Sequence, residues 1–459
     1  MIHSRASTSS TFRRNVLSGR DRGHQAGQYD ARAMQSFVIE GGRPLSGTVR
    51  AAGNKNGALP ILAACVLASD AIRLSNVPRI RDVETMVELL ADLGADVEWS
   101  GSNEIRVDPT GIGKTALDPE LAREIRASFL LAGPLLSRFG RVTVPPPGGD
   151  VIGRRRLDTH VHAFAALGAV FELDGVYELT ANGLRGARVY LDEASVMGTE
   201  NAIMAAVLAE GETVLGHAAC EPHIQDLCRF LVSLGADIEG IGSNVLHIRG
   251  VDRLEGGEYE IGPDHIEVAS FVGLAAATGG EVVVEHVQPD DLISIVPAFR
   301  KLGIEMEIME GSVRVPAGQS LTIEDDFGGQ IPKIESGVWP AFPADLTSIA
   351  VTVATQARGT ILIFEKMFES RLFFVDKLVS MGARIILCDP HRVVVTGPAT
   401  LYGERLESPD IRAGMAMVIA SLCAEGTSTI GNIGQIDRGY ERIDERLRGL
   451  GASIERADL

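Results

Sequence analysis

The chain has 459 residues, 45% hydrophobic and 23% charged, which is the balance of a folded globular protein and excludes wholesale disorder. Its 61 acidic and 43 basic residues give a net charge of −18, which argues against broad binding to nucleic acids or anionic membranes. Uncharged stretches such as residues 57–69 are shorter than the roughly 18 residues of a membrane span. Five cysteines without a CxxC pair are typical of a reducing cytosol, so we expect a cytoplasmic protein. The length of 459 residues favours two domains.

The first 33 residues differ in composition from the rest of the chain. They are rich in arginine and serine, and they show almost no periodic apolar pattern. We therefore expect residues 1–33 to form a disordered extension outside the fold. An over-long start ahead of Met34 and an organelle transit peptide both explain this composition, and the over-long start is favoured.

From residue 34 onward, one short glycine motif recurs six times. It occurs at Leu93-Gly94-Ala95, Leu167-Gly168-Ala169, Leu234-Gly235-Ala236, Leu302-Gly303-Ile304, Met381-Gly382-Ala383 and Leu450-Gly451-Ala452. An amphipathic helix is expected before each glycine, because apolar residues such as Ile224, Leu227 and Leu231 form one stripe. The glycine caps this helix, and two short strands follow, for example at 238–240 and 245–249. The spacing predicts six copies of one supersecondary unit.

A second helix, nearly apolar on all sides, is expected in each copy. These helices are predicted at 55–69, 124–139, 199–209, 265–278, 344–357 and 411–424. A helix without a polar face must be buried on every side. The sequence therefore predicts an α/β (α+β) fold of six βαβαββ repeats, arranged as a two-domain inside-out α/β barrel with sheets around the interior helices.

Each domain is expected to hold three repeats. Because a first strand at 37–39 precedes the first complete repeat, one domain should take both chain ends. We predict domain one at residues 54–262, and domain two at residues 34–53 plus 263–459. The chain would then cross between the domains near 50–54 and 261–264.

Unusual charges lie at the starts of the predicted interior helices. They are Lys55 and Asn56, Arg126, residues 195–200 and 264–267, Asp345, and Asp410 with Arg412. A helix N-terminus carries partial positive charge, so a cation there is unfavourable unless an anion joins it. Aspartate at a helix start is often only a cap, and this alternative stands equally for Asp345 and Asp410.

Basic loops form a second set of candidates, at residues 76–81, 147–156, 365–371 and 436–438. Taken alone, the run Arg154-Arg155-Arg156 is most simply a solvated loop, but cations at equivalent positions of other repeats weaken that interpretation. The pattern favours a substrate with several phosphate or carboxylate groups, together with carboxylates that move protons. No HExxH, Walker A or GxGxxG pattern indicates a metal or a nucleotide cofactor, and His160 and His223 are interpreted as solvated or hydrogen-bonded bystanders.

Several of these segments resemble one known family. They are residues 52–60, Arg126-Ala127-Ser128, residues 147–153, Pro343-Ala344-Asp345, residues 410–413 and residues 437–442. Over about 35–459 the chain is similar to the UDP-N-acetylglucosamine 1-carboxyvinyltransferases, which are enolpyruvyl transferases. The sister 5-enolpyruvylshikimate-3-phosphate synthases share the fold, but Lys55-Asn56 and the 147–153 loop favour the UDP-sugar branch. A catalytically silent, ligand-binding relative is the third alternative.

The resemblance implies transfer of the enolpyruvyl group of phosphoenolpyruvate to the 3′-hydroxyl of UDP-N-acetylglucosamine, without a cofactor, metal, nucleic acid or membrane partner. It implies the substrate-binding residues Lys55, Asn56, Arg81, Arg126, Arg155, Arg156, Leu157, Asp158, Thr159, Glu193, Ala194, Ser195, Val196, Asp345, Met367, Arg371, Asp410, Arg412 and Arg438. Within this set, the cations hold the phosphate and carboxylate of phosphoenolpyruvate. Asp345 would be the base and Asp150, on a mobile loop at 147–156, the proton donor, with Lys55 and Arg438 as catalytic cations.

Three positions depart from the pattern that the resemblance implies. Most members carry cysteine where Asp150 stands, so we expect insensitivity to fosfomycin, an epoxide that alkylates that cysteine. Arg81 stands where lysine is usual, which keeps the charge and changes the geometry. Met197 replaces a more usual glycine in the expected turn after Ser195-Val196, where it would alter contact with the uridine diphosphate.

Overall fold

The computed structural model describes residues 35–149, 152–153 and 155–458. The predicted extension at 1–33 therefore lies outside the described residues, and so does Asp150. Within the described ranges, no helix combines the length and the apolar character that crossing a membrane requires.

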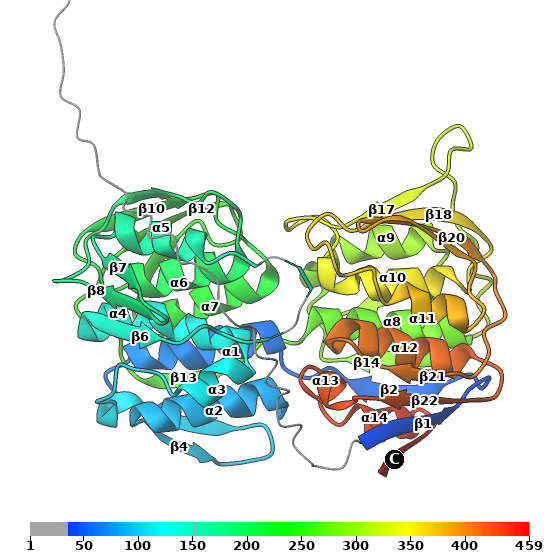
Figure 1. Ribbon diagram of the computed structural model, residues 1–459, viewed down its shortest axis with the longest axis horizontal. Coiled ribbons are helices and arrows are strands. Elements are labelled where there is room, and N and C mark those ends of the chain that lie inside the picture. The colour runs from blue at the N-terminus through cyan, green and yellow to red at the C-terminus, as the bar shows by residue number, and fades with distance from the viewer. Residues whose placement is uncertain (1–34, 150–151, 154, 459) are drawn as a thin grey trace, which may run out of the picture.

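The molecule has two lobes, each with its own hydrophobic core (Figure 1). The first core uses residues between Ala58 and Ile261. The second combines residues between Phe37 and Ala51 with residues between Ile266 and Ile454. We call these two parts the first lobe and the second lobe.

Six small mixed sheets surround the cores, as the repeats predict. In the first lobe the strand orders are β13(Gly257–Glu260)-β3(Ile72–Ser75)-β5(Ile105–Asp108)-β4(Asp96–Trp99), β6(Arg141–Val144)-β8(Tyr177–Thr180)-β7(Val170–Leu173) and β11(Asp237–Glu239)-β12(Val245–Arg249)-β10(Glu212–Gly216)-β9(Arg188–Tyr190). In the second lobe they are β15(Glu307–Met309)-β16(Ser312–Val315)-β14(Glu281–Glu285)-β2(Ser46–Arg50), β17(Lys333–Glu335)-β18(Gly359–Phe364)-β20(Arg392–Gly397)-β19(Ile385–Asp389) and β21(Arg405–Glu407)-β22(Thr427–Gly431)-β1(Gln35–Glu40)-β23(Ser453–Asp458). The sheet of β6, β7 and β8 corrects the expectation of six complete repeats, because its fourth strand is reduced to a single parallel bridge between Ala116 and Thr143.

The apolar helices lie inside the lobes. They are α1(Lys55–Ala64), α4(Ala132–Phe139) and α6(Val196–Ala206) in the first lobe, and α8(His265–Thr278), α10(Thr347–Ala354) and α12(Ile411–Cys423) in the second. Helices α8, α10 and α12 pack against one another, and residues 265–276 of α8 are all buried. Helix α6 begins earlier than the predicted residue 199, because the Ser195 side chain accepts a hydrogen bond from the backbone N–H of Gly198 and caps it.

Three predicted interior helices are interrupted. Arg126–Leu131 (η3) and Ala344–Leu346 (η5) are 3-10 turns that lead into α4 and α10, and Cys65–Leu67 (η1) is a 3-10 turn that ends α1. Apolar periodicity cannot separate a 3-10 turn from an α-helix in stretches this short. The tighter turns place Arg126 and Asp345 just ahead of α4 and α10.

The amphipathic helices cover the outside of each lobe. They are α2(Arg81–Leu93), α5(Asp158–Ala166), α7(Pro222–Ser233), α9(Ile295–Lys301), α11(Val375–Ser380) and α14(Ile443–Gly449). The remaining short elements are α3(Pro119–Glu124), α13(Gly434–Asp437), η2(Pro109–Gly111) and η4(Pro289–Leu292). In α7 the predicted stripe is buried, and α2 ends at Gly94, whose φ of 109° suits a residue without a side chain.

The lobes exchange strands through two adjacent crossings. Strand β2 precedes α1 in the chain but pairs with β14 in the second lobe, and β13 precedes α8 but pairs with β3 in the first. At the crossings, the backbone N–H of Asn54 donates to the Gly262 carbonyl oxygen at 2.8 Å, and the N–H of Asp264 donates to the Ala52 carbonyl oxygen at 2.9 Å. This exchange sets the starts of α1 and α8 side by side between the lobes.

Candidate active site

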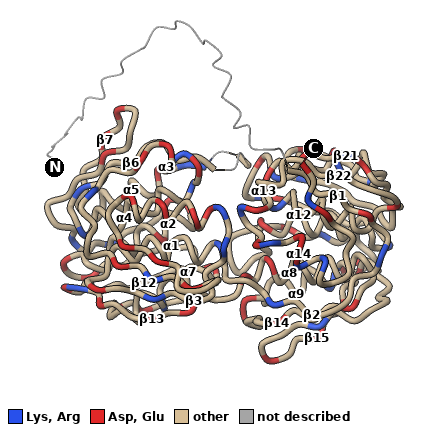
Figure 2. Tube along the Cα trace, turned by 90° about the horizontal axis from the view of Figure 1, so that it is seen from below, with Lys and Arg blue, Asp and Glu red and all other residues tan. Residues whose placement is uncertain are grey.

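A cavity of about 280 Å³ lies between the lobes and is lined by both. Figure 2 shows basic and acidic segments gathered where the lobes face each other. The wall includes these residues predicted from the sequence: Lys55, Asn56, Arg126, Arg155, Val196, Asp345, Met367, Arg371, Arg412 and Arg438. Side chains from distant repeats therefore meet in one space.

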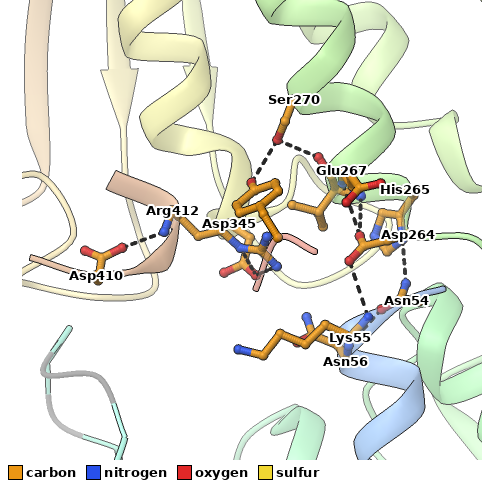
Figure 3. A network of polar contacts seen from close by, with 12 residues as sticks. Asn54, Lys55, Asn56, Asp264, His265, Glu267, Ser270, Asp345, Asp410 and Arg412 are labelled. Carbon is orange, nitrogen blue, oxygen red and sulfur yellow. Dashed lines mark hydrogen bonds and ion pairs between the residues drawn. The ribbon is translucent and has the colours of Figure 1, made fainter. Parts of the chain in front are cut away.

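Asp345 occupies the second-lobe wall between two arginines. Arg371 Nη2 donates to its Oδ1 at 2.7 Å. Arg412 Nε donates to its Oδ2 at 3.1 Å, and Figure 3 shows Arg412 beside Asp345. Burial alone would raise the pKa of Asp345, but the charges of Arg412, Arg371 and Lys55 hold it well below the ordinary value. In the described part of the chain, Arg371 Nε and Arg412 Nη1 are buried without a hydrogen-bond partner, so both can donate to an anion in the cavity.

Asp410 has a different role from Asp345. Its side chain accepts hydrogen bonds from the backbone N–H groups of Arg412, at 2.8 Å, and Ala413, at 2.9 Å, at the start of α12 (Figure 3). The helix-cap interpretation therefore holds for Asp410. Asp345 caps no helix, because its oxygens bond to arginine side chains.

Asp82, which sequence reasoning missed, links the cations of the opposite wall. Its carboxylate lies 2.9 Å from Lys55 Nζ and 2.8 Å from Nε of Arg438 in the second lobe. Burial acts to raise the pKa of Asp82, yet the Lys55 and Arg438 charges lower it overall. In sequence Asp82 looks like an ordinary acidic residue in the first turn of α2, and its one signal is a neighbouring predicted site residue, Arg81.

Arg126 and Arg155 form another cationic part of the wall. Arg126 Nη2 donates to the backbone carbonyl oxygen of Arg155 at 2.7 Å. Burial, together with the Arg155 charge, lowers the pKa of Arg126 to about 10. A negatively charged ligand beside these two guanidinium groups would relieve their repulsion.

Wall residues outside the predicted site set include Glu200, Glu221, His223, His265 and Trp339. The expectation that His223 is solvated or hydrogen-bonded is wrong, because it is 5% exposed on the cavity wall and its ring nitrogens have no partner within the described chain. His160 is buried rather than solvated, and its Nδ1 is 2.9 Å from the side-chain amide nitrogen of Asn201. The sequence marked 195–200 and 264–267 as starts of interior helices, but Glu221, His223 and Trp339 gave no signal.

Sequence comparison identifies the family. Residues 39–447 match the family described as EPSP synthase (3-phosphoshikimate 1-carboxyvinyltransferase). The chain belongs to this carboxyvinyltransferase family. The UDP-N-acetylglucosamine 1-carboxyvinyltransferase of Bradyrhizobium diazoefficiens is 56% identical over 92% of this chain and 97% of that protein. The protein of the same name from Treponema pallidum is 54% identical over 92% of this chain and 99% of that protein, so the resemblance seen in the motifs is confirmed.

Solved structures of carboxyvinyltransferase relatives share the fold. The enolpyruvyl transferase NikO from Streptomyces tendae superposes with a TM-score of 0.83 at 24% identity, covering 93% of this chain and all of that one. EPSP synthase from Acinetobacter baumannii gives a TM-score of 0.72 at 19% identity, covering 92% of this chain and all of that one. At these identities the likeness concerns the fold alone.

In this carboxyvinyltransferase, other predicted residues lie off the cavity wall. They are Arg81, Arg156, Leu157, Asp158, Thr159, Glu193, Ala194, Ser195 and Asp410. Arg156 bonds to Asp158 and Asp192 at 3.0 Å each, and Thr159 donates to Asp192 at 2.7 Å, so these side chains form a polar cluster at the start of α5. Met197 does line the wall, but from the first turn of α6 rather than from the expected turn, because Ser195 starts the helix.

Proposed function

We propose that the chain transfers the enolpyruvyl group of phosphoenolpyruvate to the 3′-hydroxyl of UDP-N-acetylglucosamine and releases phosphate. The observation that carries this proposal is the interlobe cavity, where Lys55 and five arginines share the wall with Asp345. Two anionic reactants need such a concentration of fixed cations, because the protein as a whole is acidic. The names of the relatives at 54–56% identity support the choice of substrates. In a cell, this reaction would be the first committed step of peptidoglycan synthesis, in the cytoplasm.

The proposed reaction is an addition followed by an elimination. A general acid adds a proton to the methylene carbon of phosphoenolpyruvate while the sugar oxygen bonds to the carbon that carries the phosphate, and the hydroxyl proton passes to a base. The product of this step is a tetrahedral ketal. Loss of a proton from the new methyl group and cleavage of the carbon–oxygen bond to phosphate then restore the double bond and release phosphate.

In this proposal the cations of the cavity wall bind the anionic groups of phosphoenolpyruvate, and Asp345 accepts the proton. Lys55, Arg126 and Arg438 would hold the phosphate and stabilise its charge as it leaves. Arg371 and Arg412 would receive the carboxylate of phosphoenolpyruvate through the N–H groups that have no partner within the described chain. If Arg371 and Arg412 also bind a second anion, their ion pairs with Asp345 become weaker and the pKa of Asp345 rises. The Asp345 carboxylate could then accept a proton as a base.

Asp150 would supply the proton for the methylene carbon. A carboxyl group among arginines is normally ionised, so this role requires its pKa to rise when the site closes over an anionic substrate. The same aspartate leaves fosfomycin without the thiol that it alkylates, which is why we propose insensitivity. Arg81, Arg156 and residues 157–159 and 193–196 would bind the nucleotide where it leaves the cavity.

We also propose that the two lobes are domains, at 54–262 and at 34–53 plus 263–459, that close on the substrates. Contacts between the lobes support this, because Arg438 bonds to Asp82, and the backbone N–H of Arg79 donates to Glu441 at 3.0 Å. The chain passes between the lobes only at the two adjacent crossings within the described residues, so a hinge there would let the lobes rotate and change contacts such as these.

A phosphate-release assay tests the proposal. The purified chain with phosphoenolpyruvate and UDP-N-acetylglucosamine should release phosphate, and shikimate 3-phosphate in place of the UDP-sugar should give none. Release with shikimate 3-phosphate alone would support the sister activity. Calorimetric binding of both proposed substrates without phosphate release would show a silent ligand-binding protein.

A further inference from the structure

One end of the cavity differs in chemistry from the cationic wall. Glu200 on α6, with Glu221 and His223 at the start of α7, lines the cavity together with His265 and Trp339 of the second lobe. The His223 and His265 rings are stacked with centroids 6.3 Å apart, and the Trp339 ring meets His265 edge-on at 6.1 Å. We call these five residues the acidic recess.

The acidic recess holds buried polar atoms that have no partner within the described chain. They are Glu200 Oε1, Glu221 Oε2, and both ring nitrogens of His223. Glu200 is 2% exposed and His223 is 5% exposed, so bulk water does not satisfy them. Buried polar groups are nearly always hydrogen-bonded, and several unpaired groups on one wall of a cavity indicate that a ligand supplies the partners.

The charge state of the acidic recess restricts what can bind. Burial, with the nearby Glu221 charge, raises the pKa of Glu200 well above its ordinary value, which favours the neutral carboxylic acid. Burial lowers the pKa of His223 to about 4, so its ring is neutral and offers one donor and one acceptor. The Asp345 charge acts to raise the pKa of His223 and the Arg412 charge acts to lower it, so neither sign of charge dominates beside this ring, and burial raises the pKa of Glu221.

His265 adds a donor of known identity. Asn54 Oδ1 accepts hydrogen bonds from the backbone N–H groups of Asn56 and Gly57, which fixes the Asn54 side-chain nitrogen as the donor to His265 Nδ1 at 3.2 Å (Figure 3). The neutral His265 ring therefore carries its proton on Nε2. The acidic recess thus presents donors on Glu200 and His265 beside an acceptor on Glu221, which matches a ligand group with one acceptor and one donor.

We propose that the acidic recess binds the acetamido group of the acceptor sugar, with Glu200 donating to its carbonyl oxygen and Glu221 or His223 accepting from its N–H. This inference rests on the proposed function. In UDP-N-acetylglucosamine the acetamido group is on the carbon next to the one that bears the reacting hydroxyl. Asp345, His223 and His265 line the same cavity, so a sugar whose 3′-hydroxyl lies at Asp345 would direct this neighbouring group toward the acidic recess.

The test compares three acceptors with phosphoenolpyruvate in the phosphate-release assay. UDP-N-acetylglucosamine carries the acetamido group, UDP-glucose replaces it with a hydroxyl, and UDP-glucosamine replaces it with an ammonium. The variants are Glu200→Met, which is close in size and apolar, Glu200→Gln, which keeps a neutral donor, and His223→Phe. Glu239→Gln, an exposed carboxylate on β11, is the matched control.

In the Glu200→Met and His223→Phe variants, we expect the preference in kcat/KM for UDP-N-acetylglucosamine over UDP-glucose to fall about tenfold or more. The KM for phosphoenolpyruvate should stay within about twofold, because the cationic wall is unchanged. Glu200→Gln should keep most of the preference, and Glu239→Gln all of it. The unfolding temperature of Glu200→Met should hold or rise, because the variant no longer buries an unsatisfied carboxyl group.

Each contrary result overturns a different statement. An unchanged acceptor preference in Glu200→Met and His223→Phe, while the wild type turns over UDP-N-acetylglucosamine, refutes the acidic recess and leaves the proposed function standing. A matching rise in the KM for phosphoenolpyruvate reassigns these residues to the other substrate. Preference of the wild type for UDP-glucosamine shows a cation site instead. Absence of phosphate release with UDP-N-acetylglucosamine in the wild type refutes the proposed function itself.

Discussion

Replacing Asp345 with asparagine separates the contribution of this residue to stability from its contribution to catalysis. Removing one partner of a fully buried ion pair costs about 3–5 kcal/mol, because the remaining charge is left uncompensated. The side chains of Arg371 and Arg412 are each 4% exposed, whereas that of Asp345 is 27% exposed. Because the asparagine carbonyl still accepts a hydrogen bond, we expect the lower end, about 3 kcal/mol. For a cooperative unit of about 150–250 residues this lowers the unfolding temperature by roughly 6–12 °C.

Asp345→Asn should also lower kcat by about 100- to 10,000-fold, the usual contribution of a general base. The assays are differential scanning calorimetry and phosphate release, with Asp376→Asn, an exposed carboxylate on α11, as the control. Phosphoenolpyruvate should raise the unfolding temperature of Asp345→Asn more than that of the wild type, because it returns a negative charge to Arg371 and Arg412. An unchanged unfolding temperature would refute the ion-pair argument, and an unchanged kcat would refute the base.

Three further predictions follow from the same cavity. Arg438→Ala should lower kcat/KM for phosphoenolpyruvate about 100-fold or more, since it removes a charge-assisted contact, whereas the exposed Arg300→Ala should not; equal effects would contradict a role in phosphate binding. The folded-state pKa values of Asp82 and Asp345 are lowered, so their stabilising effect is complete above the unfolded pKa of about 3.9 and is lost as pH falls through the folded values. The urea midpoint should therefore decrease from about pH 5 downward, and less steeply in Asp345→Asn than in the wild type; parallel curves would show that Asp345 does not contribute. Fosfomycin should leave the activity unchanged and inactivate the Asp150→Cys variant, and stoichiometric covalent labelling with loss of activity in the unaltered chain would overturn this expectation.

The fold was predictable where local pattern and burial agree. The near absence of polar residues in 265–278 requires burial on all sides, and α8 is buried accordingly. The apolar stripe of α7 and the glycine motif after it mark the outer helix in the same way. The predicted domain boundaries place the segments of β2 and β13 away from the helices that follow them, but their partner strands could not be predicted from pattern, because β2 pairs with β14 more than 200 residues away. Strand pairing over such a distance depends on which sheet edges still have unpaired backbone groups after the helices have packed.

The site was predictable where charge conflicts with its surroundings. Lys55 and Arg126 lie in segments that are otherwise apolar, at positions where a helix disfavours cations, and both are on the cavity wall. Asp82 and Glu221 lie at the starts of outer helices, where acidic residues are common, so their sequence context conceals them. Their burial depends on contacts with Arg438 and Trp339 of the second lobe.

By itself, the sequence determined which segments must be buried, where glycine ends each outer helix, and that cations from several repeats require an anion. These properties follow from the free energy of placing each side chain in water, in an apolar core or at a helix terminus, and that free energy depends on near neighbours in the chain. Only the tertiary structure decided which charges neutralise one another, as with Asp345 between Arg371 and Arg412, and which buried groups remain without a partner. Electrostatic energy depends on distance in space, and residues 26 and 67 positions from Asp345 reach it only after the helices have packed.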